Sequence, residues 1–406
     1  MKFAHISDVH IGSWRDPKLK EASTDAFVRA VDICIEKNVD FVLISGDLFN
    51  TSLPTVERLK IVVITLKKLK RNNIPVYIIA GSHDFSPSGK TMLDVLEKAE
   101  LFKNVVKGDI ADGTLKLQFT IDEKTGAKIT GMLGKKGMLD KKYYEKLDLQ
   151  HLETEKGFKI FMYHTAITEF KPTDMELMDS VPLSLFPKHF TYYAGGHVHY
   201  IYEEEVKGYG KFVYPGALFP NNFKELEKFK HGGFYLYEDE KTNYIPIELF
   251  KVLSFIINCN MKTPEETRQT ILEHIKDENL HNTIITLRLK GTLLSGKIRD
   301  IGLKDIANEL YEKGAYFVMK NTVKLTTKEF EEIKIDPETT DKIEQRIIQE
   351  HSGKISIEDM NHDKEIEITN KLLDLLNTEK KEGERTIDYE ERIEKEFNDG
   401  LLLDLL

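Results

Sequence analysis

Cysteine is scarce in this sequence: Cys34 and Cys259 are the only two among 406 residues, and they lie far apart. No Cys-x-x-Cys spacing occurs, which favours a reduced intracellular protein over a disulfide-held secreted one. A run of about 18 apolar residues is also lacking, so no segment is expected to span a membrane. Residues 1–5 already lead into a predicted strand, which leaves no room for a signal peptide. These absences predict a soluble, cytoplasmic protein.

An excess of positive charge is absent as well, since the net charge is −10. Residues 331–406 hold 11 Lys and Arg against 23 Asp and Glu, whereas residues 1–330 hold 47 against 45. The acidity therefore belongs to the C-terminal segment. A local surface of the remainder can still bind nucleic acid, although composition alone would not suggest it. The length exceeds what one ordinary core needs and predicts two to three domains.

Five short motifs rich in histidine and aspartate follow one another along the chain. They are Asp8-Val9-His10, Gly46-Asp47, Gly81-Ser82-His83-Asp84, Tyr163-His164 and Gly196-His197-Val198-His199. Imidazole and carboxylate groups are ligands that hold divalent cations. Asp-x-His and Gly-Asp occur by chance in a chain of this length, whereas Gly-His-x-His is much rarer. The ordered combination indicates a two-metal phosphoesterase site, in which paired ions activate a phosphate and water.

Apolar runs precede the first three motifs and are flanked by helical patterns, which predicts βαβ units and a buried parallel sheet. In such sheets, ligands gather at the carboxyl ends of the strands. The predicted strands are Lys2–Ser7, Phe41–Ser45 and Val76–Ala80, and the predicted helices are Ala22–Lys37 and Pro54–Asn72, the latter capped by Thr51 or Ser52.

Two of the motifs carry ligands at positions i and i+2. Because residues two apart on a strand share a face, Asp8 with His10, and His197 with His199, are expected to act as two clamps. Asp47 lies between the clamps in sequence order, so we expect its carboxylate to bridge both ions.

The motifs resemble those of the calcineurin-like metallophosphoesterase superfamily, and within it the SbcD and Mre-eleven (meiotic recombination nuclease) family of double-strand-break repair nucleases. The similarity covers roughly residues 1–240, and Asp-x-His-Ile-Gly at 8–12 and Gly-Asp-Leu-Phe at 46–49 favour this nuclease branch. The resemblance implies an α/β fold: a four-layer calcineurin-like metallophosphoesterase sandwich with a smaller α+β capping domain and a helical C-terminal segment.

The resemblance also implies roles for individual residues. One ion would be bound by Asp8, His10, Asp47 and His199, and the other by Asp47, Ser82, His164 and His197. His83 would be the catalytic histidine that protonates the leaving group, with Asp84 a candidate to orient its ring. Two Mn²⁺ ions are implied by the family, although the ligand types are equally compatible with Zn²⁺ or Fe²⁺.

The chain departs from the family pattern at two positions. Ser82 stands where the family has an asparagine, and its shorter hydroxyl reaches an ion less easily than an amide oxygen does. This change puts the affinity of the second metal in doubt and keeps open a metal-impaired scaffold. Asn50 stands where some members carry a histidine, so any DNA contact made by that histidine does not transfer.

Residues 250–328 show a different pattern, which predicts a β-α-β-α-β unit with a capping box at Thr263 and Glu266. By position, this unit resembles the family's DNA-binding capping domain. Candidate contacts to a DNA backbone are Arg288, Lys290, Lys297 and Arg299, and a plain solvated sheet edge is an equally good reading of these four residues.

Residues 331–406 combine dense charge with apolar residues at helical spacing. A solvating tail has no need of so many leucines and isoleucines, which helices too small to form a core hide on a partner. In the family, this segment is an acidic linker followed by helices that dock on an SMC-like coiled-coil ABC ATPase, named Rad-fifty or SbcC. The family also forms homodimers through its N-terminal helices, so the resemblance implies a dimer.

The function expected from the sequence is a manganese-dependent DNA exonuclease and endonuclease that works with this ATPase on broken ends. Two alternatives remain open. A phosphodiesterase for small nucleotides would need neither a cap nor an apolar tail. A scaffold that organises the ATPase on DNA with little catalysis would explain Ser82.

Overall fold

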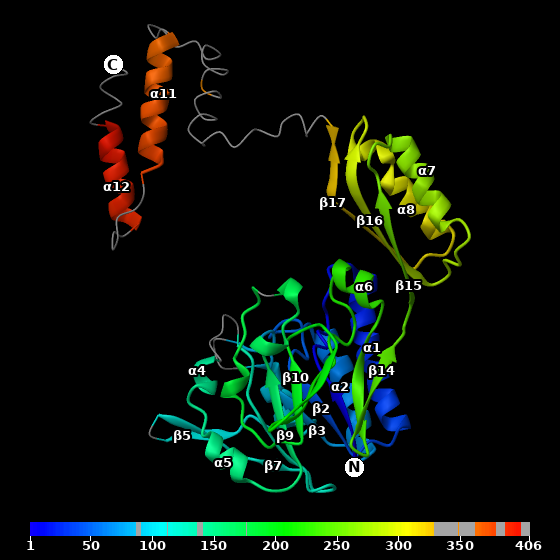
Figure 1. The fold of residues 1–406 in the computed structure, drawn as a ribbon, viewed down its shortest axis with the longest axis vertical. Coiled ribbons are helices and arrows are strands. Elements are labelled where there is room, and N and C mark those ends of the chain that lie inside the picture. The colour runs from blue at the N-terminus through cyan, green and yellow to red at the C-terminus, as the bar shows by residue number, and fades with distance from the viewer. Residues whose placement is uncertain are drawn as a thin grey trace. The chain divides into compact units, whose positions relative to one another are not determined.

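The computed structural model describes residues 1–86, 91–111, 113–135, 141–175, 177–328, 348, 362–378 and 386–398. The chain divides into two compact units, Met1–Thr326 and Thr327–Leu406 (Figure 1). Within the first unit, the predicted end of the first domain at residue 240 leaves out strand β14 (Lys241–Ile247), which belongs to the first sheet. The predicted start of the second domain at residue 250 lies one residue before strand β15 (Lys251–Asn258). The roles proposed for the three predicted domains stay predictions.

The first sheet contains the three strands predicted from the sequence. Its order is β14 (Lys241–Ile247), β13 (Gly232–Glu238), β1 (Lys2–Ile6), β2 (Phe41–Ser45), β3 (Val76–Ile79) and β4 (Lys103–Asn104). Strands β1 to β4 run parallel, whereas β13 lies antiparallel to both of its neighbours, β1 and β14. Both faces of the central strands are buried, as their uninterrupted apolar sequences predict.

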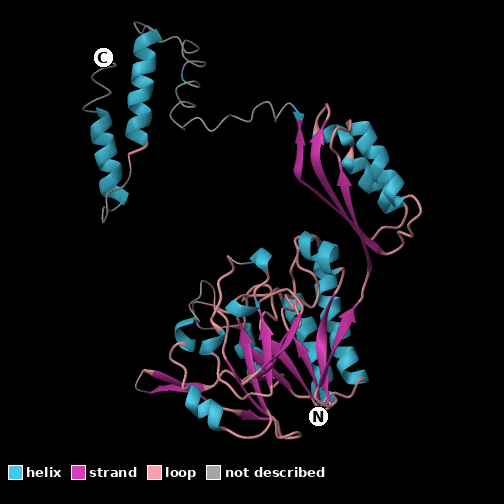
Figure 2. Ribbon diagram, viewed as in Figure 1, coloured by secondary structure: helices cyan, strands magenta, loops and turns pink. Residues whose placement is uncertain are grey.

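A second sheet has the order β11 (Tyr202–Val206), β12 (Gly210–Tyr214), β10 (Tyr192–Gly196), β9 (Lys159–His164), β8 (Lys128–Gly131) and β7 (Thr120–Ile121). Strands β8, β9, β10 and β12 run parallel. Figure 2 shows the strands of the two sheets together in the first unit. Aromatic side chains fill the space between the sheets; Phe3, for example, stacks on Phe41 and meets the edge of Tyr192.

Helices and loops cover the outer face of each sheet. Helices α1 (Pro17–Glu36), α2 (Val56–Arg71) and α3 (Met92–Lys98) cover the first sheet. On the second lie α4 (Lys141–Tyr144), α5 (Leu149–Thr154) and the 3-10 helices η2 (Thr168–Phe170), η3 (Thr173–Met175) and η4 (Leu183–Leu185), near the hairpin β5 (Gly108–Ala111) and β6 (Thr114–Leu117). The predicted four-layer sandwich is thereby confirmed.

Two helix starts differ from the sequence prediction. Helix α1 begins at Pro17, earlier than expected, because the Asp16 side chain accepts a hydrogen bond from the backbone N–H of Lys18. Helix α2 begins at Val56 with Thr55 as its N-cap, so the predicted caps Thr51 and Ser52 are wrong. The Thr51 hydroxyl instead donates to the Leu53 carbonyl within the preceding loop.

Residues 251–327 form the predicted β-α-β-α-β unit, here called the cap. It contains β15 (Lys251–Asn258), α7 (Pro264–Ile275), β16 (Thr283–Leu293), η5 (Ile298–Ile301), α8 (Leu303–Glu312) and β17 (Phe317–Thr327). The capping box of Thr263 and Glu266 is confirmed. Helices α7 and α8 bury their apolar sides with the sheet in a core of the cap's own.

The second unit contains two described helices, α11 (His362–Leu376) and α12 (Thr386–Glu396), which contact each other. Most of the acidic linker and the closing leucines at 401–406 lie outside the described residues. Leu376 and Ile387 are each more than half exposed, so the pair does not bury its apolar side chains by itself. Among the helices that the structure describes, none is both long and apolar enough to cross a bilayer.

Candidate metal centre

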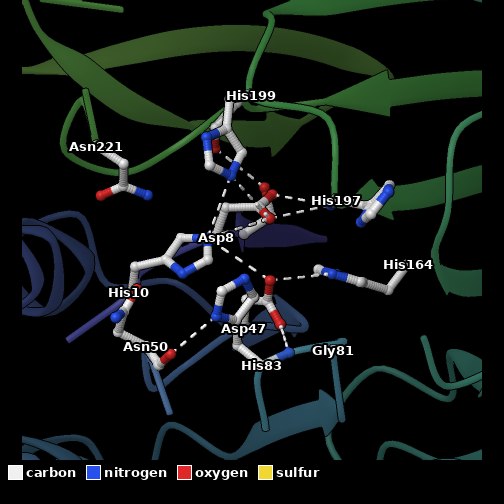
Figure 3. Close-up of polar contacts among 12 residues, drawn as sticks. Asp8, His10, Asp47, Asn50, Gly81, His83, His164, His197, His199 and Asn221 are labelled. Atoms are coloured by element: carbon white, nitrogen blue, oxygen red, sulfur yellow. Dashed lines mark hydrogen bonds and ion pairs between the residues drawn. The ribbon is translucent and has the colours of Figure 1, made fainter. Parts of the chain in front are cut away.

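The histidine and aspartate motifs meet at the carboxyl ends of the parallel strands of both sheets (Figure 3). The parallel strands of both sheets end at the same edge of the two layers, so motifs that are distant in sequence come together there. In chain order, Asp8 follows β1, Asp47 follows β2, His83 follows β3, His164 ends β9, and His197 and His199 follow β10.

The prediction that Asp8 with His10, and His197 with His199, lie as pairs on strands is wrong. Strand β1 ends at Ile6 and β10 at Gly196, so neither pair lies on a strand. Instead, Asp8, His10 and His197 have φ angles of 48°, 47° and 86°, in the left-handed region that side chains rarely occupy. Tight turns after the strands therefore aim the ligands, and their strained backbone is held by hydrogen bonds such as that from His10 N to the Asp47 carbonyl at 2.9 Å.

Three clusters of side chains place their nitrogen and oxygen atoms within 4.8 Å of one another. The clusters are Asp8 with His10 and His199, His10 with Asp47 and His83, and Asp8 with Asp47 and His164. Asp8 and Asp47 each belong to two clusters. Shared carboxylates of this kind are suited to a pair of ions at short separation.

The geometry of these side chains fits divalent cations. The Nε2 atoms of His10 and His199 lie 3.1 Å apart, so at most one of them can carry a proton between them. Nε2 of the buried His164 lies 3.3 Å from Asp47 Oδ2 without making a hydrogen bond to it. When these rings are neutral, their Nε2 lone pairs and the Asp47 carboxylate face a shared space in which cations would satisfy them. The mixed N and O donor set suits Mn²⁺, Zn²⁺ or Fe²⁺.

Acceptors behind three of the rings determine which nitrogen faces the cluster. Nδ1 of His164 lies 2.8 Å from the Ser45 carbonyl, and Nδ1 of His83 lies 2.8 Å from the Asn50 carbonyl. Since a carbonyl can only accept, Nδ1 carries a proton in both rings, and Nε2 is the nitrogen that faces the cluster. Nδ1 of His199 lies 2.9 Å from the Glu225 carboxylate, which has the same effect.

The glycine of the Gly-His-x-His motif is required by close packing. A Cβ atom at Gly196 would lie 2.0 Å from the Ser45 carbonyl oxygen, the atom that orients His164. Any side chain at this position would push that carbonyl away and turn the His164 ring.

These contacts also shift the pKa values of two imidazoles. Burial disfavours a charge on His164, yet the neighbouring Asp47 carboxylate outweighs burial and raises the pKa of His164 to about 10. Burial acts on His199 in the same way, but its hydrogen bond to Glu225 and the charge of Asp8 raise its pKa to about 9. Both rings are therefore protonated near neutral pH when no cation is bound.

Metal binding is consequently expected to release protons, because a cation needs the lone pair that a protonated ring lacks. Between about pH 7 and pH 9, the apparent metal affinity should rise with pH as these two protons are lost more easily. Calorimetric titration of Mn²⁺ in two buffers of different ionisation enthalpy measures the released protons. Equal heats in the two buffers would contradict the expectation.

Asp84 does not orient the His83 ring, and this candidate role is corrected. Its carboxylate accepts hydrogen bonds from the backbone N–H groups of Leu48, Phe49 and Gly81 at 3.0 to 3.1 Å. Asp84 thus ties the turn after β2 to the turn after β3. The Asn50 carbonyl orients His83 instead, through a backbone atom that no sequence motif reveals.

Ser82 and His197 also lie at this edge, and His197 belongs to none of the three clusters. Ser82 is buried in the turn before His83. The backbone N–H of His197 donates to both carboxylate oxygens of Asp8, at 3.0 and 3.1 Å, and its ring centroid lies 5.2 Å from that of His164. Their roles as metal ligands stay predictions.

Comparison with known proteins agrees with this geometry. Residues 1–200 match the family model of the calcineurin-like phosphoesterases. The DNA double-strand break repair protein Mre11 of Methanocaldococcus jannaschii is 34% identical over 297 residues, covering 70% of this chain and 72% of that protein. The chain belongs to the Mre11 family. It is therefore a metal-dependent phosphoesterase, and the family resemblance seen in the sequence is confirmed.

Two further proteins with the same name match this chain at lower identity. The Methanococcus maripaludis protein of the same name is 29% identical over 297 residues, which cover 67% of this chain and 73% of that protein. The Archaeoglobus fulgidus protein is also 29% identical, over 270 residues, and the chain spans only 59% of its length.

The four candidate DNA contacts all lie in the cap, Arg288 and Lys290 on strand β16, and Lys297 and Arg299 at the 3-10 helix η5. Lys290, Lys297 and Arg299 are exposed. Arg288 is only 19% exposed and its guanidinium group forms an ion pair with Glu227, so the alternative reading of a plain solvated edge does not hold for this residue. For all four residues, DNA binding stays a prediction.

Sequence reasoning missed Glu225, the carboxylate that holds His199. Asn222 and Glu225 are spaced as an N-cap and its third helical residue, and Asn222 does cap helix α6 (Phe223–Phe229). That spacing could have predicted the helix start. It could not have shown that the glutamate reaches a histidine more than twenty residues earlier.

Proposed function

We propose that this chain is a manganese-dependent DNA exonuclease and endonuclease that hydrolyses phosphodiester bonds at broken ends in double-strand-break repair. The observation that carries the proposal is the convergence of imidazole and carboxylate groups at the shared edge of two sheets, beside His83. The name shared by its relatives, DNA double-strand break repair protein Mre11, supports DNA as the substrate.

In this proposal, Asp8, His10, Asp47 and His199 hold one Mn²⁺, and Asp47, Ser82, His164 and His197 hold the other. The ions supply Lewis-acid activation of the phosphodiester and of water. His83 holds a proton on the nitrogen opposite Asn50 and delivers it to the leaving oxygen. The Ser45 carbonyl and the Glu225 carboxylate keep Nε2 of His164 and His199 turned toward the centre.

The partner proposed for the second unit is an SMC-like coiled-coil ABC ATPase of the Rad-fifty or SbcC type. Helices α11 and α12 leave apolar side chains uncovered, with Leu376 60% and Ile387 64% exposed. Short amphipathic helices of this kind dock in apolar grooves or on coiled coils of partners. The acidic residues around them favour a basic surface beside the docking site.

A homodimer is proposed through helix α2 and the loop before it. Leu53, Val56 and Ile64 are 76%, 77% and 51% exposed on this part of the molecule. Large apolar side chains that are this exposed are a feature that an interface between protein chains would cover.

The proposal is tested by incubating a labelled duplex DNA with the full chain and Mn²⁺, with and without the chelator EDTA. We expect cleavage that EDTA abolishes and that added Mn²⁺ restores. A cyclic dinucleotide in place of DNA tests the alternative of a small-nucleotide phosphodiesterase. Cleavage of that substrate alone would contradict the proposal.

A catalytically weak scaffold is the alternative that buried Ser82 keeps open. Failure to cleave DNA even with the ATPase and ATP present would favour it. The variant Ser82→Asn then distinguishes a nuclease with a weak second metal site from a scaffold without activity. The longer amide side chain should raise Mn²⁺ affinity and restore cleavage only if the chain is such a nuclease.

A further inference from the structure

The short helix α6 touches both the metal centre and the cap. Its side chain Leu226 is fully buried in the core of the nuclease layers, and the helix packs against strands β15 and β16 of the cap. Residues two apart on a helix point to nearly opposite sides. Glu225 and Glu227 use this geometry to reach different partners.

Glu225 faces the metal centre. One carboxylate oxygen lies 2.9 Å from Nδ1 of His199, and the other accepts the backbone N–H of Asn221 at 2.7 Å. The Asn222 side chain also donates to this carboxylate and caps the helix. With 12% of its side chain exposed, Glu225 is held by the helix start itself, so a displacement of α6 moves the acceptor that orients His199.

Glu227 faces the cap. Its carboxylate accepts two hydrogen bonds from Nε of Arg288, at 2.8 and 3.0 Å, and one from Nη2 at 2.9 Å. The same guanidinium group lies 4.9 Å from the centre of the Phe223 ring at the start of α6. Both charged side chains are less than one-fifth exposed. A bidentate, partly desolvated ion pair of this kind has a defined geometry, so a displacement of Arg288 with the cap would move Glu227 and helix α6.

We propose that α6 couples the cap to the metal centre, with Arg288 and Glu225 as positioning residues. Arg288 holds α6 where Glu225 keeps Nε2 of His199 turned toward Asp8 and His10. A cap movement that breaks the Arg288 to Glu227 pair frees α6 and loosens His199 as a ligand. The inference rests on the proposed metal centre and adds to it a dependence on the cap.

The experiment measures Mn²⁺ affinity of the metal-free full chain by calorimetry, without DNA and without turnover. Glu225→Ala should weaken the affinity by about 10 to 100-fold, as loss of a carboxylate behind a histidine ligand does, and Glu225→Gln should recover part of the loss. Arg288→Met should weaken it by about 5-fold although it lies in another domain. In the Glu225→Ala background, Arg288→Met should add no further loss.

Arg268→Met provides the matched control. Arg268 is also an arginine of the cap and approaches Glu309 at 3.9 Å, away from α6, so its loss should leave Mn²⁺ affinity unchanged. Thermal unfolding of each variant checks that it folds. The double variant Arg288→Met with Glu227→Gln removes the ion pair between these two residues without leaving an unpaired buried charge. If folded Arg288→Met, or this double variant, binds Mn²⁺ as tightly as the unmodified chain, the coupling is overturned but the metal centre is not. A native chain that binds no Mn²⁺ would overturn the metal centre and the coupling together.

Discussion

Replacing His83 with alanine is expected to lower the rate of DNA hydrolysis by about 10² to 10⁴-fold, the usual contribution of a positioned general acid. Mn²⁺ affinity should stay unchanged. The Asn50 carbonyl holds the proton on Nδ1, which leaves Nε2 as the nitrogen that serves the leaving oxygen. The contact from this residue to Asp47 is made by its backbone N–H, at 2.8 Å, and survives the substitution.

A second substrate tests the role of the proton. Bis(p-nitrophenyl) phosphate has a leaving group that needs no protonation, so His83→Ala should slow its hydrolysis far less than that of DNA. His274→Ala is the matched control, because Nδ1 of His274 also lies 2.8 Å from a backbone carbonyl, that of Thr270 in the cap. A parallel fall in Mn²⁺ affinity and in both activities would instead identify His83 as a ligand with His10 and Asp47.

Asp47→Asn is expected to lower the rate of DNA hydrolysis by about 10³-fold or more, because metal ions contribute several kcal/mol to stabilising the transition state of such reactions. Asp47 Oδ2 lies 3.6 Å from Nε2 of His10 and 3.3 Å from Nε2 of His164, so a neutral amide weakens both proposed ion sites at once. The near-identical shape of asparagine keeps an oxygen available for the His83 N–H.

Thermal unfolding with and without Mn²⁺ measures this effect without turnover. Saturating Mn²⁺ should raise the midpoint of the native chain and leave that of Asp47→Asn in place, since a ligand stabilises only the folded state that binds it. Asp122→Asn is the matched control, a buried carboxylate that accepts the Tyr77 hydroxyl at 2.8 Å and belongs to none of the metal clusters. An equal Mn²⁺ shift in native protein and in Asp47→Asn would contradict a bridging role.

Much of the fold could be predicted because local signals and the global fold agree. The apolar runs at 41–45 and 76–79 form buried central strands, and the alternation of strands and helices at 251–327 matches the cap element by element. Helix starts were less predictable. Asp16 and Thr55 cap α1 and α2, and several residues near each start were equally suitable by type.

The candidate site was predicted in composition but not in geometry. Asp8 and His10 were expected on one face of a strand, yet left-handed turns after the strand aim them. Which turn forms depends on hydrogen bonds to the neighbouring loop, such as that from His10 to the Asp47 carbonyl, and these exist only once the sheet is assembled.

The sequence by itself determined the chemical character of the candidate site, because the types and order of Asp8, Asp47, His83, His164 and His199 specify donors suited to divalent cations next to the proposed proton donor. Only the tertiary structure decided which atoms do the orienting. The carbonyls of Ser45 and Asn50 are common to every residue type and carry no sequence signal. Glu225 and Arg288 acquire their partners through packing between segments far apart in the chain, a long-range property that local patterns do not contain.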